Sequence, residues 1–285
     1  MTGALLGKRS TTEEFDKFNS MTKYPSILTY HQLGERGRLT NERIFDIPRG
    51  VEIHGTEKID GTNSRMTMIL TPHGYDYFIG SREKWFYSCG DRIYNPDQGI
   101  VETFKKFDIE SRISELHIAI EEAKIDTFPN GFPYGIYTIY SEVYGGEVNA
   151  WKQYTNTKTY GFRVFDISYI SFPQYYDLAA LPREEIAHWR DNGNQTFLSA
   201  NRRLEICEIM GLETVPYIFC FKSDDLPVTL EETLEFLNKF KTTKAGIDAE
   251  GEAEGVVIRT SDRSIIAKIR FEDYRRTLNI QKKKK

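Results

Sequence analysis

The chain has 285 residues, of which 39% are hydrophobic and 28% charged, with a formal net charge of −4. This composition excludes a disordered, collagen-like or fibrous protein and predicts a globular fold. No apolar run approaches the roughly 20 residues that cross a bilayer, and the first residues lack the apolar stretch of a signal peptide, so we expect a cytoplasmic protein with no membrane partner.

The first fifty residues mix turn residues with short apolar pieces, which predicts a lead-in of loops and small strands. From Val51 onward, short β-rich segments dominate. Their alternation and aromatic content predict strands. The predicted strands lie within 65–70, 75–79, 134–140, 160–170, 215–221, 254–260 and 264–270.

Three helices are predicted between these strands. The first lies within 110–124, where four apolar residues share one face at helical spacing: Ile113, Leu116, Ile120 and Ala123. The second runs from about Ser199 to Met210, with Gly211 beyond its end. The third begins at Thr229, where Thr229 and Glu232 form a capping box.

The order of these elements predicts an α+β fold of mostly antiparallel sheets flanked by helices. No internal repeat and no Gly/Ser-rich or Pro-rich linker divides the chain. We therefore expect one continuous domain over residues 51–285, preceded by the lead-in segment, 1–50.

Cysteine and histidine give no metal signal in the sequence. The three cysteines and five histidines are scattered, with no C-x-x-C pair and no histidines at metal-ligand spacing. Neither a zinc site nor a disulfide framework is expected.

The segment TEKIDGTNSRM places Lys58 beside a carboxylate and a tight glycine turn, directly before a strand. A lysine ordinarily has a pKa of about 10.4, so its use as a nucleophile requires burial or neighbouring cations that make the free amine accessible. A K-x-D-G tetrapeptide alone is also common in surface turns, and the other motifs decide between the two interpretations.

Those other motifs follow in order from Lys58 to Arg270, and together they resemble the ATP-dependent ligases and capping enzymes, the covalent nucleotidyltransferases. KIDGTN is similar to their motif I. The further matches are GSREKW with Arg82, YSEVYGG with Glu142 (motif III), YGFRVFDIS with Phe165 and Asp166 (motif IIIa), EGVVIR with Glu254 and Arg259 (motif IV), and IIAKIR with Lys268 and Arg270 (motif V). The resemblance implies an adenylation (nucleotidyltransferase) domain over 51–285.

The resemblance also implies the chemistry. Lys58 would attack the α-phosphorus of ATP, expel pyrophosphate and form lysyl-AMP, with Mg²⁺ or Mn²⁺ as the metal cofactor. Lys268, Arg270 and Arg259 would neutralise the phosphates and favour the neutral amine on Lys58. Glu254 is the expected metal ligand, and Asp166 is a second candidate.

Other residues are expected to bind the nucleotide. Phe165 is suited to stacking on adenine, although Phe162 could replace it, and Val257 could form the opposite wall. Glu142 would accept hydrogen bonds from the ribose. The remaining predicted contacts are Arg82, Asn63 and, at the adenine edge, Glu57.

The details of the motifs favour RNA ligases, of the phage and bacterial kind. Asn63 stands where DNA ligases and capping enzymes usually have arginine, and IAKIRFEDY resembles the closing segment of RNA ligases. One departure is Arg270, where a lysine is usual. The chain ends fifteen residues after Arg270, which leaves little room for a C-terminal OB domain and disfavours capping.

We therefore predict an RNA ligase that acts as a monomer. Its partner would be a nucleic acid, RNA rather than DNA, which the negative net charge does not exclude because a local groove can still be basic. The alternatives are an ATP-dependent DNA ligase and a non-catalytic protein of the same fold that binds nucleic-acid ends.

Overall fold

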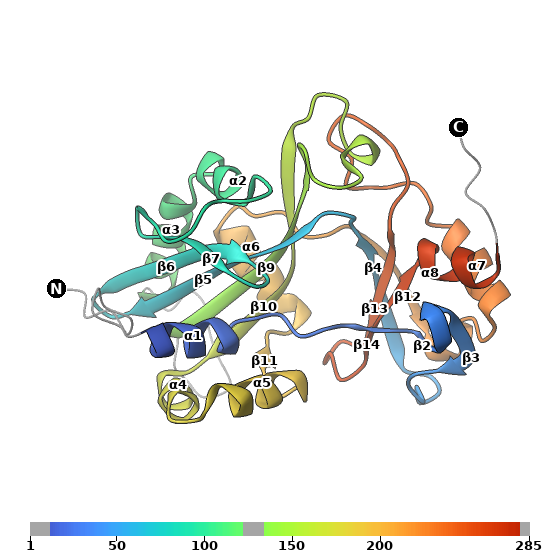
Figure 1. The fold of residues 1–285 in the computed structure, drawn as a ribbon, viewed down its shortest axis with the longest axis horizontal. Coiled ribbons are helices and arrows are strands. Elements are labelled where there is room, and N and C mark those ends of the chain that lie inside the picture. Colours follow the sequence, from blue (N-terminus) through green and yellow to red (C-terminus); the bar gives the residue numbers. More distant parts are fainter. Residues whose placement is uncertain (1–11, 122–133, 280–285) are drawn as a thin grey trace. The chain divides into compact units, whose positions relative to one another are not determined.

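The computed structural model describes residues 12–121 and 134–279 (Figure 1). Their contacts divide the chain into two compact units. Unit 1 contains the described residues of 1–26, 62–143 and 160–214, and unit 2 those of 27–61, 144–159 and 215–285. The chain therefore passes from unit 2 into unit 1 directly after the KIDG segment.

Unit 1 is built on a seven-stranded sheet with the order β11-β10-β9-β5-β6-β7-β8. The central pairs β5–β6, β5–β9 and β6–β7 are antiparallel. The strands are β5 (Thr62–Thr71), β6 (Gly74–Ser81), β7 (Trp85–Ser88), β8 (Asp91–Arg92), β9 (Gly135–Gly145), β10 (Tyr160–Ile170) and β11 (Thr196–Phe197).

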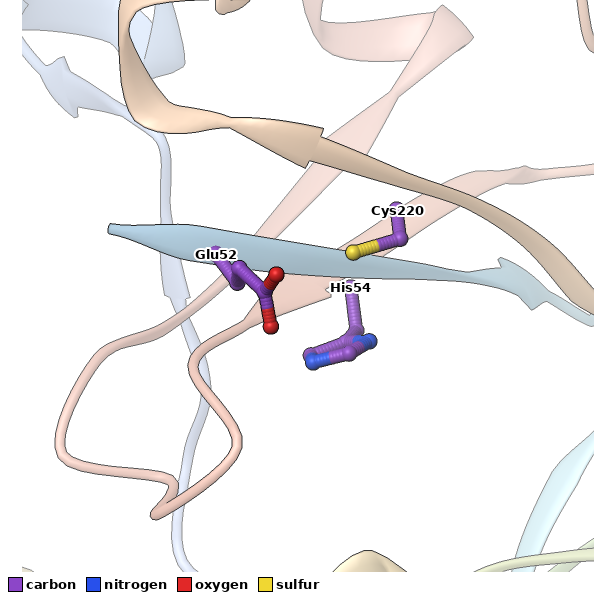
Figure 2. A group of neighbouring side chains, drawn as sticks. All are labelled: Glu52, His54 and Cys220. Carbon is purple, nitrogen blue, oxygen red and sulfur yellow. The ribbon is translucent and has the colours of Figure 1, made fainter. Parts of the chain in front are cut away.

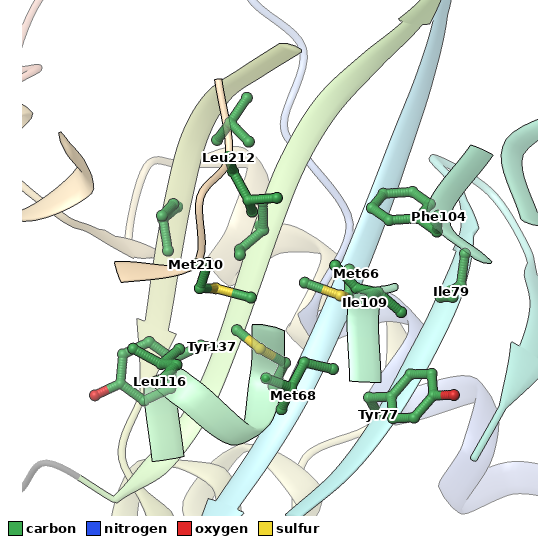
Figure 3. Close-up of a cluster of buried hydrophobic side chains, with 14 of the residues drawn as sticks. Met66, Met68, Tyr77, Ile79, Phe104, Ile109, Leu116, Tyr137, Met210 and Leu212 are labelled. Carbon is green, nitrogen blue, oxygen red and sulfur yellow. The ribbon is translucent and has the colours of Figure 1, made fainter. Parts of the chain in front are cut away.

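Helices cover both faces of this sheet, because alternate residues of the central strands are apolar on both sides. Met66 and Met68 of β5 belong to the core beneath α2, α3 and α6 (Figure 3). Ile69, which points the other way, belongs to the core beneath α1, α4 and α5. The helices are α1 (Thr12–Met21), α2 (Ile100–Lys106), α3 (Ile109–Glu121), α4 (Phe172–Ala179), α5 (Arg183–Asp191) and α6 (Ala200–Ile209).

Unit 2 contains a five-stranded sheet with the order β1-β14-β13-β4-β12 and a two-stranded sheet, β2-β3. All its pairs are antiparallel except β1–β14. The strands are β1 (Leu28–Thr29), β2 (His31–Leu33), β3 (Leu39–Arg43), β4 (Glu52–Lys58), β12 (Tyr217–Lys222), β13 (Gly255–Arg259) and β14 (Ile266–Arg270).

One face of the five-stranded sheet is apolar and packs on two helices, α7 (Leu230–Asn238) and α8 (Phe271–Thr277). Ile53, Val256 and Ile269 are wholly buried in this core. Three short 3₁₀ turns complete the unit: η1 (Glu35–Gly37), η2 (Trp151–Gln153) and η3 (Ser223–Asp225). The described chain after β14 holds α8 alone as regular structure, so it contains no C-terminal OB domain.

The structure confirms the α+β class, the mostly antiparallel sheets and the predicted strands and helices. Ser199 caps α6, and Thr229 and Glu232 form the predicted capping box of α7. Ala123 lies outside the described residues. Helix α1 was not predicted, and the division into a lead-in, 1–50, and a domain, 51–285, stays a prediction. None of the helices in the described chain is long and apolar enough to cross a membrane.

Candidate active site

Lys58 is the last residue of β4, and the register of the sheet sets its neighbours. Gly255, the first residue of β13, is paired with Lys58 on one side and with Arg270 of β14 on the other. A Cβ at Gly255 would lie 2.0 Å from the backbone oxygen of Ile269. Only glycine therefore allows the close strand spacing at the point where Lys58 and Arg270 flank β13.

The amine of Lys58 is paired with the carboxylate of Glu254. Lys58 Nζ donates to Glu254 Oε2 at 2.5 Å, and Arg270 Nη1 lies 3.7 Å from Glu254 Oε1. Two backbone bonds fix Glu254, since its N–H donates to the carbonyl of Lys58 and its carbonyl accepts from Phe271. The side chains of Lys58 and Glu254 are only 24% and 18% exposed, so solvent reaches the pair without fully screening it.

Arg270 is held by a carboxylate from the helix that follows it. Its Nε and Nη2 donate to the two oxygens of buried Asp273 at 2.7 and 2.9 Å. Burial alone would lower the pKa of Arg270, but the hydrogen bonds and charge of Asp273, together with Glu254, raise it above the ordinary value. Arg270 is thus a fixed, permanent positive charge beside Lys58 and Glu254.

Lys268 adds a further cation on the same strand. It lies two residues before Arg270, on the same face of β14, and is paired with Val257 of β13. Burial, followed by the positive charges of Arg270 and Lys58, lowers the pKa of Lys268. Unit 2 therefore brings together three of the predicted cations around one carboxylate, an arrangement suited to a dense anion such as a polyphosphate.

A buried tyrosine that the sequence did not single out supports the turn after Lys58. The N–H of Asp60 donates to the hydroxyl of Tyr154 at 2.7 Å. Burial raises the pKa of Tyr154, which keeps the hydroxyl neutral. Tyr154 therefore anchors the KIDG turn without adding a charge beside the lysine.

Two predicted residues of unit 2 lie apart from this group. Arg259 is buried at the other end of β13, opposite His54. Glu57 is directed to the opposite side of the sheet from Lys58, where its carboxylate accepts from Thr243 Oγ1 and from the N–H of Lys244. Burial raises the pKa of Glu57. Glu57 also lines a cavity of about 980 Å³ within unit 2.

Unit 1 groups three of the other predicted residues at the start of β5. Asn63 is paired with Glu142 of β9, and its carbonyl accepts from the N–H of Arg82 at 3.2 Å. Asn63 and Arg82 line a cavity of about 640 Å³ within this unit. Asn63 Oδ1 is buried and has no hydrogen-bond partner among the described residues.

Phe165 and Asp166 lie on β10. The alternation of this strand is interrupted there, because Phe162 and Val164 face the core beneath α3 and α6, and the next residue to do so is Ile167. Phe165 is half-buried, with its ring centroid 4.9 Å from that of Tyr24. Asp166 is fully buried and accepts from the Tyr24 hydroxyl at 2.9 Å. The adenine role of Phe165 and the metal role of Asp166 stay predictions.

The comparisons with known proteins agree with the motifs. The model of the RNA ligase family matches residues 51–275, and the chain belongs to this family. No curated protein matches the sequence.

Among solved structures, the chain is similar to a Naegleria gruberi RNA ligase variant with ATP and Mn, at 12% identity and a TM-score of 0.50, over 82% of this chain and 53% of that one. A second variant of that ligase, with AMP and Mn, matches at 13% identity and a TM-score of 0.49, over 90% of this chain and 65% of that one. At this identity the first match shows the fold, and the chain spans about half the length of that ligase.

Proposed function

We propose that this protein is an ATP-dependent RNA ligase that joins 5′-phosphate and 3′-hydroxyl ends through lysyl-AMP on Lys58. The observation that carries this proposal is the group formed by Lys58, Glu254, Lys268 and Arg270, because it unites motifs I, IV and V in one part of unit 2. Membership of the RNA ligase family supports it.

In the first step, Lys58 Nζ attacks the α-phosphorus of ATP. The P–N bond forms as the bond to the pyrophosphate oxygen breaks, and the pyrophosphate leaves with its electron pair. Nζ donates a hydrogen bond to the Glu254 carboxylate, which places an acceptor for its proton beside the amine. Lys268 and Arg270 would neutralise the negative charge that shifts onto the leaving pyrophosphate.

The residues present fit a magnesium or manganese ion. Glu254 offers one carboxylate beside the proposed phosphate site, and Mg²⁺ is usually bound by one or two carboxylates together with substrate phosphates. We propose Glu254 as the ligand, and the metal would neutralise charge on the phosphates when bound. Asp166 remains the second candidate, although its carboxylate is engaged by Tyr24.

The nucleotide contacts are proposed residue by residue. Asn63 is assigned a hydrogen bond to the nucleotide because its buried oxygen is unpaired among the described residues. The other assignments rest on the motifs alone: ribose for Glu142, adenine for Phe165, Val257 and Glu57, phosphate for Arg259, and a nucleotide contact of unspecified kind for Arg82.

The later steps complete the ligation. AMP passes from Lys58 to the 5′-phosphate of the polynucleotide, and the 3′-hydroxyl then attacks that activated end and releases AMP. We propose RNA rather than DNA as the acceptor because of Asn63 and the family. A monomeric state and a cytoplasmic location also belong to this proposal.

The test is adenylation with each α-labelled nucleotide, followed by a chase with 5′-phosphorylated RNA or DNA. We expect label from ATP, loss of label in Lys58→Ala, and release of label onto RNA. Lys158→Ala is the matched control, since Lys158 forms an exposed pair with Glu147 at 3.1 Å. Labelling by GTP would indicate a capping enzyme. Transfer of the label to nicked DNA alone would indicate a DNA ligase, and the absence of labelling by any nucleotide would indicate a non-catalytic protein that binds nucleic-acid ends.

A further inference from the structure

A second cluster of potential metal ligands lies on unit 2, away from Glu254. Glu52 and His54 are two residues apart on β4 and therefore share a face, and Cys220 of β12 is paired with His54 (Figure 2). One ligand atom from each of the three lies within 4.8 Å of the others. Glu52 and Cys220 are exposed and His54 is half-buried, so an ion can reach all three from solvent.

The donor set selects a particular class of cation. Thiolate, imidazole and carboxylate together suit Zn²⁺ and similar transition metals, whereas Mg²⁺ and Ca²⁺ prefer oxygen ligands alone. Ligand bonds of about 2.0 to 2.3 Å in a tetrahedral site place donor atoms roughly 3.5 Å apart. The donor atoms, which lie within 4.8 Å of one another, would approach by roughly 1 Å through side-chain rotation when the ion binds.

The surroundings also suit a metal ligand at His54. Its Nδ1 lies 3.2 Å from Tyr217 Oη and its Nε2 lies 2.8 Å from Ser261 Oγ, so either ring nitrogen can bind a metal while the other keeps a hydrogen-bond partner. The competing cation is Lys222, 3.4 Å from Glu52. Both members of that pair are more than half exposed, which makes it a weak competitor for a divalent ion.

We propose that Glu52, His54 and Cys220 form a second metal site, which binds Zn²⁺ or a similar transition-metal ion and leaves its fourth position to water. His54 precedes Lys58 by four residues on β4, so the two sites are about 13 Å apart along the strand. The second site is therefore separate from the proposed Mg²⁺ site at Glu254, and it does not depend on the ligase function.

The test is titration of the whole protein, without nucleotide, with Co²⁺ as a spectroscopic substitute for Zn²⁺. We expect one Co²⁺ per chain, a sulfur-to-cobalt charge-transfer absorption, and displacement by Zn²⁺. Cys220→Ser should abolish that absorption, whereas Cys89→Ser, which removes another exposed thiol, should leave it unchanged.

His54→Gln and Glu52→Gln keep the thiol and should weaken binding at least about tenfold. Urea unfolding of each variant shows whether it is folded. If one of Cys220→Ser, His54→Gln and Glu52→Gln does not fold, the other two still test the site. No charge-transfer absorption in the wild-type protein with excess Co²⁺, or an absorption that survives in Cys220→Ser, would overturn the proposal.

Discussion

Glu254→Gln tests the two roles that we assign to the Glu254 carboxylate, which differ in the size of their effects. The carboxylate accepts a hydrogen bond from Lys58 Nζ at 2.5 Å and so positions the amine. In the complex with ATP, we propose that it binds the metal. The glutamine keeps the shape of the side chain but removes its charge, so the variant loses both effects together.

The effects differ in size. The ion pair with Lys58 is partly solvated, at 24% and 18% exposure, so its loss should lower the free energy of unfolding by only about 1 kcal/mol. Arg270 stays in place because Asp273 holds it independently. Loss of the metal ligand acts on the transition state, and we expect the adenylation rate to fall at least about 100-fold, which is about 2.7 kcal/mol of activation free energy.

The assay is the rate of labelling by α-labelled ATP over a range of Mg²⁺ concentrations. Glu254→Gln should need much more Mg²⁺ than the wild-type protein and remain slow at saturation. Glu252→Gln is the matched control, because Glu252 is equally shielded but is paired with Arg275 at 2.6 Å. A wild-type rate and Mg²⁺ dependence in Glu254→Gln, or an equal loss in Glu252→Gln, would refute the reasoning.

Three further substitutions test the folded framework. Burial raises the pKa of Glu57, so the folded protein keeps that proton to higher pH than the unfolded chain. The free energy of unfolding should therefore fall as the pH rises above the ordinary glutamate pKa of about 4.3, and Glu57→Gln should flatten this dependence in urea unfolding. Arg65→Lys should lower the free energy of unfolding by about 2–4 kcal/mol. The buried guanidinium donates hydrogen bonds to Ser81, Asn19 and Thr22, and a lysine ammonium cannot reproduce this planar geometry. A loss under about 1 kcal/mol would contradict this reasoning. Gly255→Ala should lower the free energy of unfolding by about 2–4 kcal/mol and impair adenylation, since the new Cβ would clash with the backbone of β14. An unchanged melting temperature would show that the two strands can move apart without cost.

Much of the fold could be predicted because the central elements follow simple periodicities. Strands of alternating or continuous apolar residues and the capping box of α7 are local signals, and local structure obeys them. Helix α1 was missed although it carries a comparable signal. Phe15, Phe18 and Met21 recur at a spacing of three and pack into the core of unit 1, but charged residues between them obscured the pattern.

The candidate site could be predicted only where motifs mark it. The order of the motifs identified Lys58 and Glu254, and the structure places them in direct contact. The supports of the site come from elsewhere in the chain. Tyr154 reaches Asp60 through tertiary packing that no local pattern reveals, whereas Asp273 could have been found from its position three residues after Arg270, at the start of a helix.

The pairing of His54 with Cys220 shows the same limit. Metal motifs are recognised in a sequence by short spacings between ligands, and these two residues are distant in the chain. The antiparallel pairing of β4 and β12 makes them neighbours. Such a cluster becomes visible only when the sheet order is known.

Peptide mass spectrometry after incubation with ATP and Mg²⁺ tests the central claim most directly, because it locates the covalent adduct. We predict an acid-labile adenylate on the peptide that contains Lys58, with none on the peptide that contains Lys268. An adenylate on another lysine, or an unmodified Lys58 peptide after full incubation, would contradict the assignment of the nucleophile.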